Sequence, residues 1–189
     1  MSWETSIKGF KSYLQIERSL SINSVQAYIR DVKKFANYAI PLELSELKIE
    51  RGNISDFLVE LKDDGIAARS QARIISGIKA FYKYLIIEDY IKYDPTELIE
   101  SPKVGFKLPD TLSLIEIDKL ISAVDLSNKQ GERNRAILET LYSCGLRVSE
   151  LTNLKLSNIY FNEGYLKVIG KGDKERLAPI GGRALKYLT

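Results

Sequence analysis

The segment Cys144-Gly145-Leu146-Arg147-Val148-Ser149-Glu150-Leu151 marks the place where the pattern of this sequence changes. Gly145 is typical of a residue that ends a helix, because glycine readily adopts the left-handed conformation found there. A second short helix is predicted directly after it, over residues 148–154. Beyond that helix the apolar residues recur with a period of two, which indicates β-strands. Arg147 therefore lies where a helical region meets a small sheet.

Three short antiparallel strands are predicted after this segment. They cover Leu156 to Tyr160, Tyr165 to Ile169 and Arg176 to Ile180, with turns at residues 162–164 and 170–174. Two helices are predicted before it. One begins at Ser113-Leu114-Ile115-Glu116, which fits a capping box, and the other runs from about Arg133 to Ser143. The C-terminal part of the chain is therefore expected to be a mixed α/β domain with a small antiparallel sheet.

Residues 1 to about 88 have the apolar spacing of four amphipathic helices. Ser21 or Asn23 is the expected N-cap of the second of them. Four apolar stripes on one chain predict a small helical bundle, because each stripe must be buried against another. The stripes consist of Trp3, Ile7, Phe10 and Leu14; Val25, Ile29, Val32 and Phe35; Ile54, Phe57, Leu58 and Leu61; and Ile74, Ile78, Phe81 and Leu85.

A proline-rich connection separates these two parts of the chain. Asp94-Pro95 and the stretch from Ser101 to Pro109 contain three of the five prolines, and each proline disfavours helix in the residue before it. We therefore predict a helical domain over residues 1–100, a linker over residues 101–109 and a second domain over residues 110–189. The expected fold class is mainly α, with the sheet confined to the second domain.

Composition excludes several classes of protein. Apolar residues make up 44% of the chain and charged residues 28%, as in an ordinary globular protein. No apolar run approaches the ~18 residues of a membrane helix, and the N-terminus lacks a signal-peptide pattern, so we expect a cytoplasmic protein without membrane contact. One cysteine and no histidine leave no plausible zinc site, and we expect no metal or other cofactor. Cys144 is expected to be a small buried residue.

The net charge of +3 does not by itself reveal a nucleic-acid partner, so the question is which faces carry the basic groups. On the fourth predicted helix a polar set follows helical spacing, and on the second a similar set lies away from much of the apolar stripe. Such faces are often only solvated. Alternatively they contact a duplex, with basic groups on phosphates and polar side chains on base edges. The two sets are Arg69, Arg73, Ser76 and Lys83, and Ser24, Tyr28, Arg30 and Lys34.

Arg147 and Lys171 are the candidates for chemistry. An arginine in the turn before a helix can grip two oxygens of a phosphate while backbone amides face the same anion. Alternatively, Arg147 caps the helix or pairs with Glu150. Lys171 lies between Gly170 and Gly172 at a predicted hairpin tip, where the glycines allow a tight turn and leave a long cation free to swing. The alternative is a solvated turn lysine.

The segment around Arg147, followed at this distance by the lysine hairpin, closely resembles the first part of the catalytic domain of the tyrosine recombinases. This is the phage integrase superfamily, and the resemblance is to its Xer-type site-specific recombinases. Residues 24–31 and 70–76 resemble the two helices that the family's SAM-like core-binding domain lays against the duplex. The resemblance extends from about Ser6 to Ile180. It implies a four-helix core-binding domain joined to the N-terminal part of a catalytic domain, which together form a clamp around DNA.

The resemblance also implies roles for single residues. Arg147 would be the first catalytic arginine, which holds the non-bridging oxygens of the scissile phosphate, and Glu150 would orient it. Lys171 would be the general acid that protonates the leaving 5′ oxygen. Lys174 and Arg176 would contact the phosphate backbone beside the hairpin. The family's reaction is strand cleavage and rejoining through a 3′-phosphotyrosyl intermediate, without a metal or nucleotide cofactor.

The sequence also departs from the family pattern. It has no histidine, so the His-x-x-Arg motif is missing, and none of its eleven tyrosines lies in the context of the family's nucleophile. We therefore expect a truncated bacterial recombinase that binds a double-stranded recombination site without cutting it. The full-length protein is expected to act as a homo- or heterotetramer on paired sites. The alternative is a natural non-catalytic DNA-binding protein, a decoy or regulator that occupies recombination sites.

Overall fold

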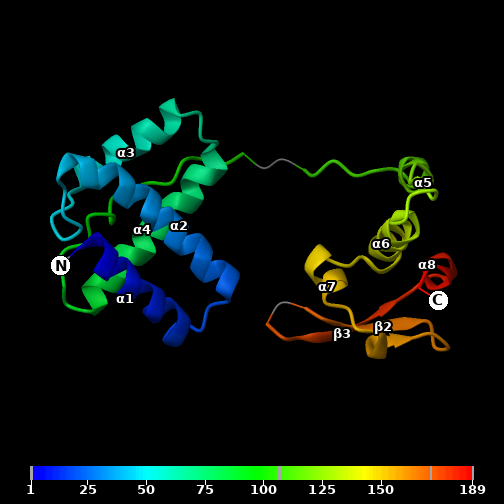
Figure 1. Ribbon diagram of the computed structural model, residues 1–189. Coiled ribbons are helices and arrows are strands. Elements are labelled where there is room, and N and C mark those ends of the chain that lie inside the picture. Colours follow the sequence, from blue (N-terminus) through cyan, green and yellow to red (C-terminus); the bar gives the residue numbers. More distant parts are fainter. Residues whose placement is uncertain (1, 106–107, 171, 189) are drawn as a thin grey trace. The chain divides into compact units, whose positions relative to one another are not determined.

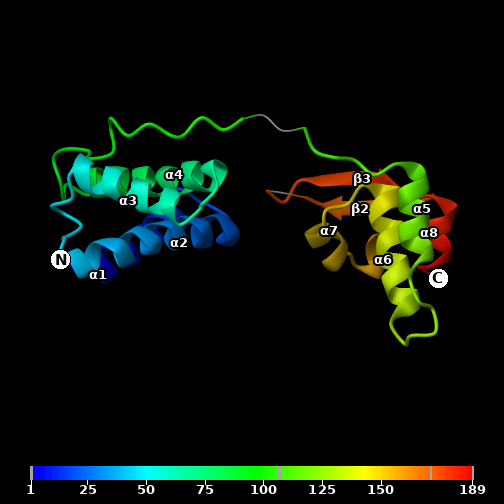
Figure 2. The ribbon, with the colours of Figure 1, turned by 90° about the horizontal axis from the view of Figure 1, so that it is seen from above.

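The computed structural model describes residues 2–105, 108–170 and 172–188. The chain forms two compact units, Met1–Lys107 and Leu108–Thr189, each with a hydrophobic core of its own (Figures 1 and 2). Most described residues are helical, and a three-stranded antiparallel sheet lies in the second unit. The predicted fold class, mainly α with a small antiparallel sheet, is confirmed. None of the described helices has the length and apolar character needed to cross a membrane.

Four helices build the N-terminal unit, as the apolar stripes predict. They are α1 (Trp3–Ile16), α2 (Ile22–Ala39), α3 (Arg51–Asp63) and α4 (Ala68–Ile87), and the 3-10 turn η1 (Ile40–Leu42) follows α2. Of the two expected N-caps of α2, Ser21 takes the position, because its hydroxyl accepts a hydrogen bond from the backbone N–H of Ser24. This bond satisfies one of the unpaired N–H groups at the start of the helix.

Aromatic side chains fill the core of this unit. Phe10, Phe35 and Phe81 are fully buried. Trp3 of α1 stacks on Phe81 of α4 with 5.9 Å between ring centroids, and it meets Phe35 of α2 edge-on at 5.6 Å. Each such pair adds about 0.5–1.5 kcal/mol beyond the burial of its area. The Trp3 indole N–H also donates to the carbonyl of Leu44 at 2.9 Å, which ties α1 to the segment after α2.

Helices α2 and α4 come close together at Gly77. A Cβ atom on this buried residue of α4 would lie 2.7 Å from the Cβ of Asp31 on α2. Asp31 is only 4% exposed, and both of its carboxylate oxygens accept hydrogen bonds from Nη1 of Arg73, at 2.5 and 2.6 Å. Burial raises the pKa of the Asp31 carboxyl, and the charge of Arg73 opposes that change. The ion pair and the glycine together set the spacing of these two helices.

The C-terminal unit combines helices with the sheet. Helices α5 (Leu114–Ser122), α6 (Gly131–Cys144) and α7 (Val148–Thr152) are followed by the 3-10 turn η2 (Leu156–Asn158) and the strands. The strands β1 (Ile159–Tyr160), β2 (Tyr165–Ile169) and β3 (Glu175–Pro179) pair in this order, and α8 (Gly182–Lys186) follows. Helix α6 packs against β3 and α8. The small core includes Cys144, Leu146, Leu166, Val168 and Ala178.

Two sequence signals in this unit are confirmed. The Ser113 hydroxyl accepts from the N–H of Glu116, and the Glu116 carboxylate accepts from the N–H of Ser113, so the capping box is present. Gly145 ends α6 with a φ of +57°, in the left-handed region that favours glycine. Cys144 is buried as expected, and burial raises the pKa of its thiol.

The prediction of the strands is partly wrong. In the first of them only Ile159 and Tyr160 pair with β2, whereas residues 156–158 form η2, in which the Asn158 N–H donates to the Lys155 carbonyl. Leu156 is 76% exposed, so its apolar side chain does not mark an inward-facing strand position. Strand β3 begins and ends one residue earlier than predicted, and α8 was not predicted from the sequence.

We predict that Gly77→Ala destabilises the N-terminal unit. Alanine normally favours a helix over glycine by up to ~1 kcal/mol, but here the added methyl group meets Asp31, and overpacking typically costs about 1–3 kcal/mol. Gly52→Ala is the control, because a Cβ atom at Gly52 in α3 would meet no other atom within 4 Å. Urea unfolding should show a lower midpoint for Gly77→Ala and an unchanged or higher one for Gly52→Ala. Equal gains in both variants would contradict the close approach of α2 and α4.

Candidate functional site

The candidate site in the C-terminal unit is built around the buried carboxylate of Glu150. Its side chain is 3% exposed. One oxygen, Oε1, accepts from Nη1 of Arg147 at 2.8 Å; the other, Oε2, accepts from the backbone N–H of Arg147 at 2.9 Å and from Nη2 of Arg176 at 2.8 Å. A buried carboxylate is stable only when it is paired and hydrogen-bonded. Three donors from two arginines meet that requirement here.

These contacts hold Glu150 in its ionised form. The backbone N–H of Arg147 and the two guanidinium groups lower the pKa of the Glu150 carboxyl, although its burial acts in the opposite direction. The carboxylate carries one negative charge, and the two guanidinium groups around it carry two positive charges. The cluster of Glu150, Arg147 and Arg176 therefore has a net positive charge, which favours the binding of an anion.

Arg147 is held at one side and open at the other. It is the N-cap residue of α7, directly after Leu146 and the left-handed Gly145. One of its side-chain N–H groups contacts Glu150, yet 71% of its side chain is exposed. A guanidinium group has five N–H donors in a planar fork, so donors remain for an external anion. Of the two alternatives for Arg147, a phosphate ligand or a partner of Glu150, the pair with Glu150 is present. Most of the side chain remains exposed, so the pair does not block contact with a phosphate.

The hairpin between β2 and β3 begins beside the same carboxylate. A Cβ atom on Gly170 would lie 3.4 Å from Oε1 of Glu150, and the Gly170 N–H donates to the carbonyl of Lys174 at 2.8 Å. Gly172 has a φ of +74°, so a tight turn there depends on glycine. Lys174 is exposed. Lys171, the predicted proton donor, lies outside the described residues.

The role of Arg176 at this site was missed by the sequence analysis, which treated it as a contact to the DNA backbone. Arg176 lies opposite Val168 in the sheet, and Leu166 lies opposite Ala178. Every second residue of a strand lies on the same face of the sheet, and Leu166, Val168 and Ala178 are buried on the inward face. Arg176 shares that face, so its side chain is directed toward Glu150. The signal was available in the sequence: the period of two places Arg176 in step with the buried Ala178 and Ile180.

The predicted polar face of α4 is present. Arg69, Arg73, Ser76 and Lys83 are all exposed on one side of the helix. Arg73 differs from the others, because its guanidinium group is engaged by Asp31 while 52% of its side chain remains exposed. Arg73 therefore stabilises the packing of α4 against α2, whether or not it also contacts a partner. This pair was not predicted from the sequence, because the two residues are 42 positions apart in the chain.

The predicted set on α2 does not form one exposed face. Arg30 and Lys34 are exposed. Tyr28 is half-buried, packs against the hydrophobic core and meets the ring of Phe10 edge-on at 6.5 Å, so the expectation that it lies away from the apolar stripe is wrong. Ser24 is also half-buried, and its hydroxyl lies 3.0 Å from that of Ser21. The structure therefore leaves Arg30 and Lys34 exposed, whereas Ser24 and Tyr28 are half-buried.

Two family models match the chain. Residues 7–89 match the model described as phage integrase, N-terminal SAM-like domain, and residues 111–189 match that of the phage integrase family. Tyrosine recombinase XerD of Staphylococcus aureus (strain Mu50 / ATCC 700699) is 43% identical over 187 residues, which are 98% of this chain and 63% of that protein. XerD of Staphylococcus haemolyticus (strain JCSC1435) is 41% identical, with the same coverage. The chain thus spans 63% of the length of these curated relatives.

Solved structures agree in fold. A lambda integrase dimer bound to a COC′ core site has a TM-score of 0.76 at 22% identity, over 98% of this chain and 65% of that one. XerH site-specific recombinase bound to a palindromic difH substrate has a TM-score of 0.70 at 19% identity, over 96% of this chain and 55% of that one. At such identities the likeness concerns the fold alone. The two family models and the XerD identity lead to one conclusion: this chain belongs to the phage integrase family, the tyrosine recombinases, and within it resembles the Xer type.

Proposed function

We propose that these residues form the DNA-binding and phosphate-holding part of a site-specific recombinase. In the complete enzyme the reaction is strand cleavage and rejoining through a 3′-phosphotyrosyl intermediate. The observation that supports this best is the anchoring of Arg147 by the buried Glu150, at 2.8 Å and 2.9 Å, with most of the arginine side chain left exposed. Such an arrangement presents a preorganised fork of N–H donors to a phosphate.

In this proposal Arg147 binds the non-bridging oxygens of the scissile phosphate. Negative charge grows on these oxygens during phosphoryl transfer, and donors that are already fixed in place stabilise it without reorganisation. Glu150 is a positioning residue, because it holds both the backbone and the side chain of Arg147. Arg176 keeps Glu150 ionised from the other side, so its task at the site is to hold the carboxylate. This role is proposed in addition to the expected contact with the DNA backbone, because 40% of the Arg176 side chain is exposed.

Lys171 completes the phosphate-holding part as the proposed general acid. Its neighbour Gly170 lies against Glu150, so the hairpin starts at the same anchor that holds Arg147. An alkoxide leaving group is strongly basic, and a positioned proton donor typically contributes about 10²–10⁴-fold to its departure. The exposed Lys174 is proposed to contact a neighbouring phosphate.

The proposed DNA partner of the N-terminal unit is a double-stranded recombination site. The exposed face of α4, with Arg69, Arg73, Ser76 and Lys83, and the exposed pair Arg30 and Lys34 on α2 supply cations at helical spacing. Cations of this kind contact phosphates and position a protein on the duplex. We propose that the complete recombinase acts on paired sites as a homo- or heterotetramer, as the lambda integrase structures include a tetramer bound to a Holliday junction.

We predict that the 189 residues bind a duplex with a recombination site but form no covalent adduct with it. The family's cleavage chemistry uses a His-x-x-Arg motif and a tyrosine nucleophile, and this sequence has no histidine. A nicked suicide substrate would trap a phosphotyrosyl product. We expect a shifted complex on a native gel and only free DNA on a denaturing gel. A slow band on the denaturing gel would mean that one of the eleven tyrosines is a nucleophile.

We predict that Arg30→Gln and Arg69→Gln each weaken DNA binding on all sequences. Removal of one phosphate-binding cation should reduce the slope of log K against log salt by about 0.9. Lys62→Gln is the control, since Lys62 is exposed on α3 outside the proposed face. Arg73 is not suited to this test, because its removal leaves the buried Asp31 without its partner. Binding measured by fluorescence anisotropy with unchanged slopes for both variants would show that these faces do not meet DNA.

A further inference from the structure

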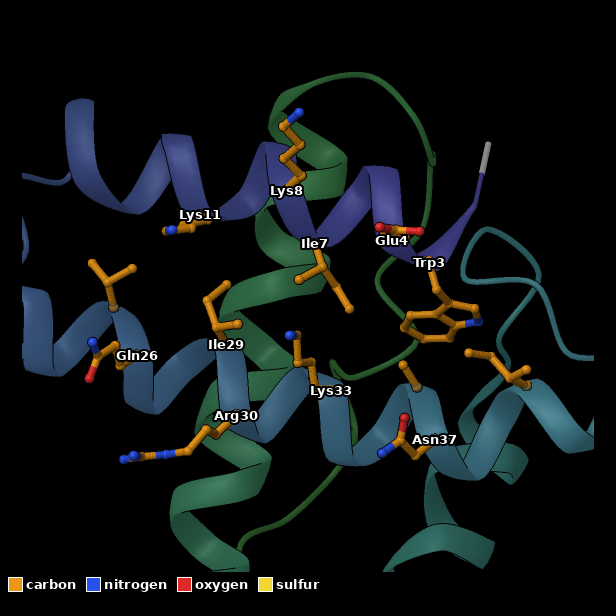
Figure 3. A pocket seen from close by; sticks show the side chains of 13 residues that line it. Trp3, Glu4, Ile7, Lys8, Lys11, Gln26, Ile29, Arg30, Lys33 and Asn37 are labelled. Carbon is orange, nitrogen blue, oxygen red and sulfur yellow. The ribbon is translucent and has the colours of Figure 1, made fainter.

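A groove runs between α1 and α2 on the N-terminal unit (Figure 3). It lies between residues 3–11 of α1 and residues 25–39 of α2, with Ile40 of η1 at its end, and has a volume of about 820 Å³. We call it the α1–α2 groove. Arg30 is the one residue of the proposed DNA-binding set that also lines it, so the proposed function leaves most of the groove unexplained.

The floor of the α1–α2 groove is apolar. Figure 3 shows Ile7 of α1 and Ile29 of α2 pointing into the space between the two helices. Val25 and Ala36 lie beneath the groove as core residues, and Ile7 is also largely buried. The apolar surface that a partner can reach comes mainly from the half-buried Ile29 and from Ile40, which is 54% exposed at the far end. Apolar surface of this kind gains free energy when apolar side chains of a partner cover it.

The rim of the groove is basic. Lys8 and Lys11 of α1 and Arg30 and Lys33 of α2 line it, and Glu4 at the Trp3 end is the one acidic residue among the lining residues (Figure 3). None of the four cations forms an ion pair within the described parts of the chain. Their charges are therefore available to a partner with carboxylates on both sides of an apolar stripe.

We propose that the α1–α2 groove binds an amphipathic acidic helix of a protein partner. The apolar stripe of that helix covers the exposed parts of Ile29 and Ile40, and its Asp and Glu side chains meet the cations on both edges. Duplex DNA fits these observations less well, because it contacts proteins through phosphates and base edges and does not bury an apolar floor. Helix-in-groove recognition uses apolar anchors at i, i+3, i+4 and i+7 on the bound helix.

The dimensions of the groove set the length of this helix. Residues 25–39 of α2 span about 21 Å and residues 3–11 of α1 about 12 Å, at 1.5 Å per residue. A bound helix of about 10–15 residues matches that span. Such an interface is small, so the complex is expected to be transient.

Trp3 supplies the readout for a test, because it is the one tryptophan of the chain and lines the end of the groove. The probe is a synthetic peptide of about 15 residues with leucines at i, i+3, i+4 and i+7 and glutamates on both flanks. We expect a saturable change in Trp3 fluorescence. The variant Lys8→Glu/Lys11→Glu should weaken binding by about tenfold or more, whereas Lys62→Glu on α3 should leave it unchanged. The unfolding midpoints of both variants are measured first, so that binding is compared only between equally stable proteins. If Lys8→Glu/Lys11→Glu does not fold, Lys8→Gln/Lys11→Gln takes its place.

Four outcomes would overturn the proposal. Equal binding of a peptide with the same composition in scrambled order would show that no amphipathic stripe is recognised. A response to a short DNA duplex that depends on Lys8 and Lys11, without a response to the peptide, would make the groove part of the nucleic-acid interface. Self-association that the same variants abolish would assign the groove to a second copy of the chain. No change in Trp3 fluorescence up to about 1 mM peptide would show that no such helix binds.

Discussion

The buried carboxylate of Glu150 is the constraint on which the proposed chemistry of this chain depends. It joins three elements: α7, to which it belongs, the turn at Arg147, and β3 through Arg176. The hairpin base at Gly170 lies against it as well. An unpaired carboxylate at this depth would be costly, and a single guanidinium would leave no excess charge. Two arginines around one carboxylate satisfy the buried group and still leave Arg147 with donors for a phosphate.

The N-terminal unit uses a similar arrangement for a different purpose. Asp31 is buried between α2 and α4 and is held by Arg73, whose side chain is half-exposed. Gly77 allows the helices to come close enough for this contact. Here the pair fixes the distance between the two helices that carry the proposed DNA-binding residues. In both units a partly exposed arginine is therefore oriented by a carboxylate that solvent does not reach.

Local features of the fold could be predicted from the sequence, because each has a local cause. The four helical stripes, the capping box at Ser113 and the helix end at Gly145 follow from spacing and from backbone preference. The errors come from tertiary contacts. Leu156 continues the period of two but faces solvent, Tyr28 turns toward Phe10, and the partners of Arg73 and Arg176 are far away in the sequence. The pair of Arg147 and Glu150 could be predicted because the two residues are three positions apart. The contact of Arg176 with Glu150 could not, because it depends on how β2 and β3 pair in the sheet.

The ionisation of Glu150 tests this account most directly. Burial alone would raise the pKa of the carboxyl above its ordinary value of 4.5, whereas the N–H groups of Arg147 and Arg176 lower it. The side-chain carboxyl carbon of Glu150 can be followed by ¹³C NMR as the pH is reduced. We predict a midpoint below 4.5 that rises in Arg176→Gln. A midpoint above 4.5 in the unaltered chain, or one that does not respond to the loss of Arg176, would contradict the claim that two arginines hold this carboxylate.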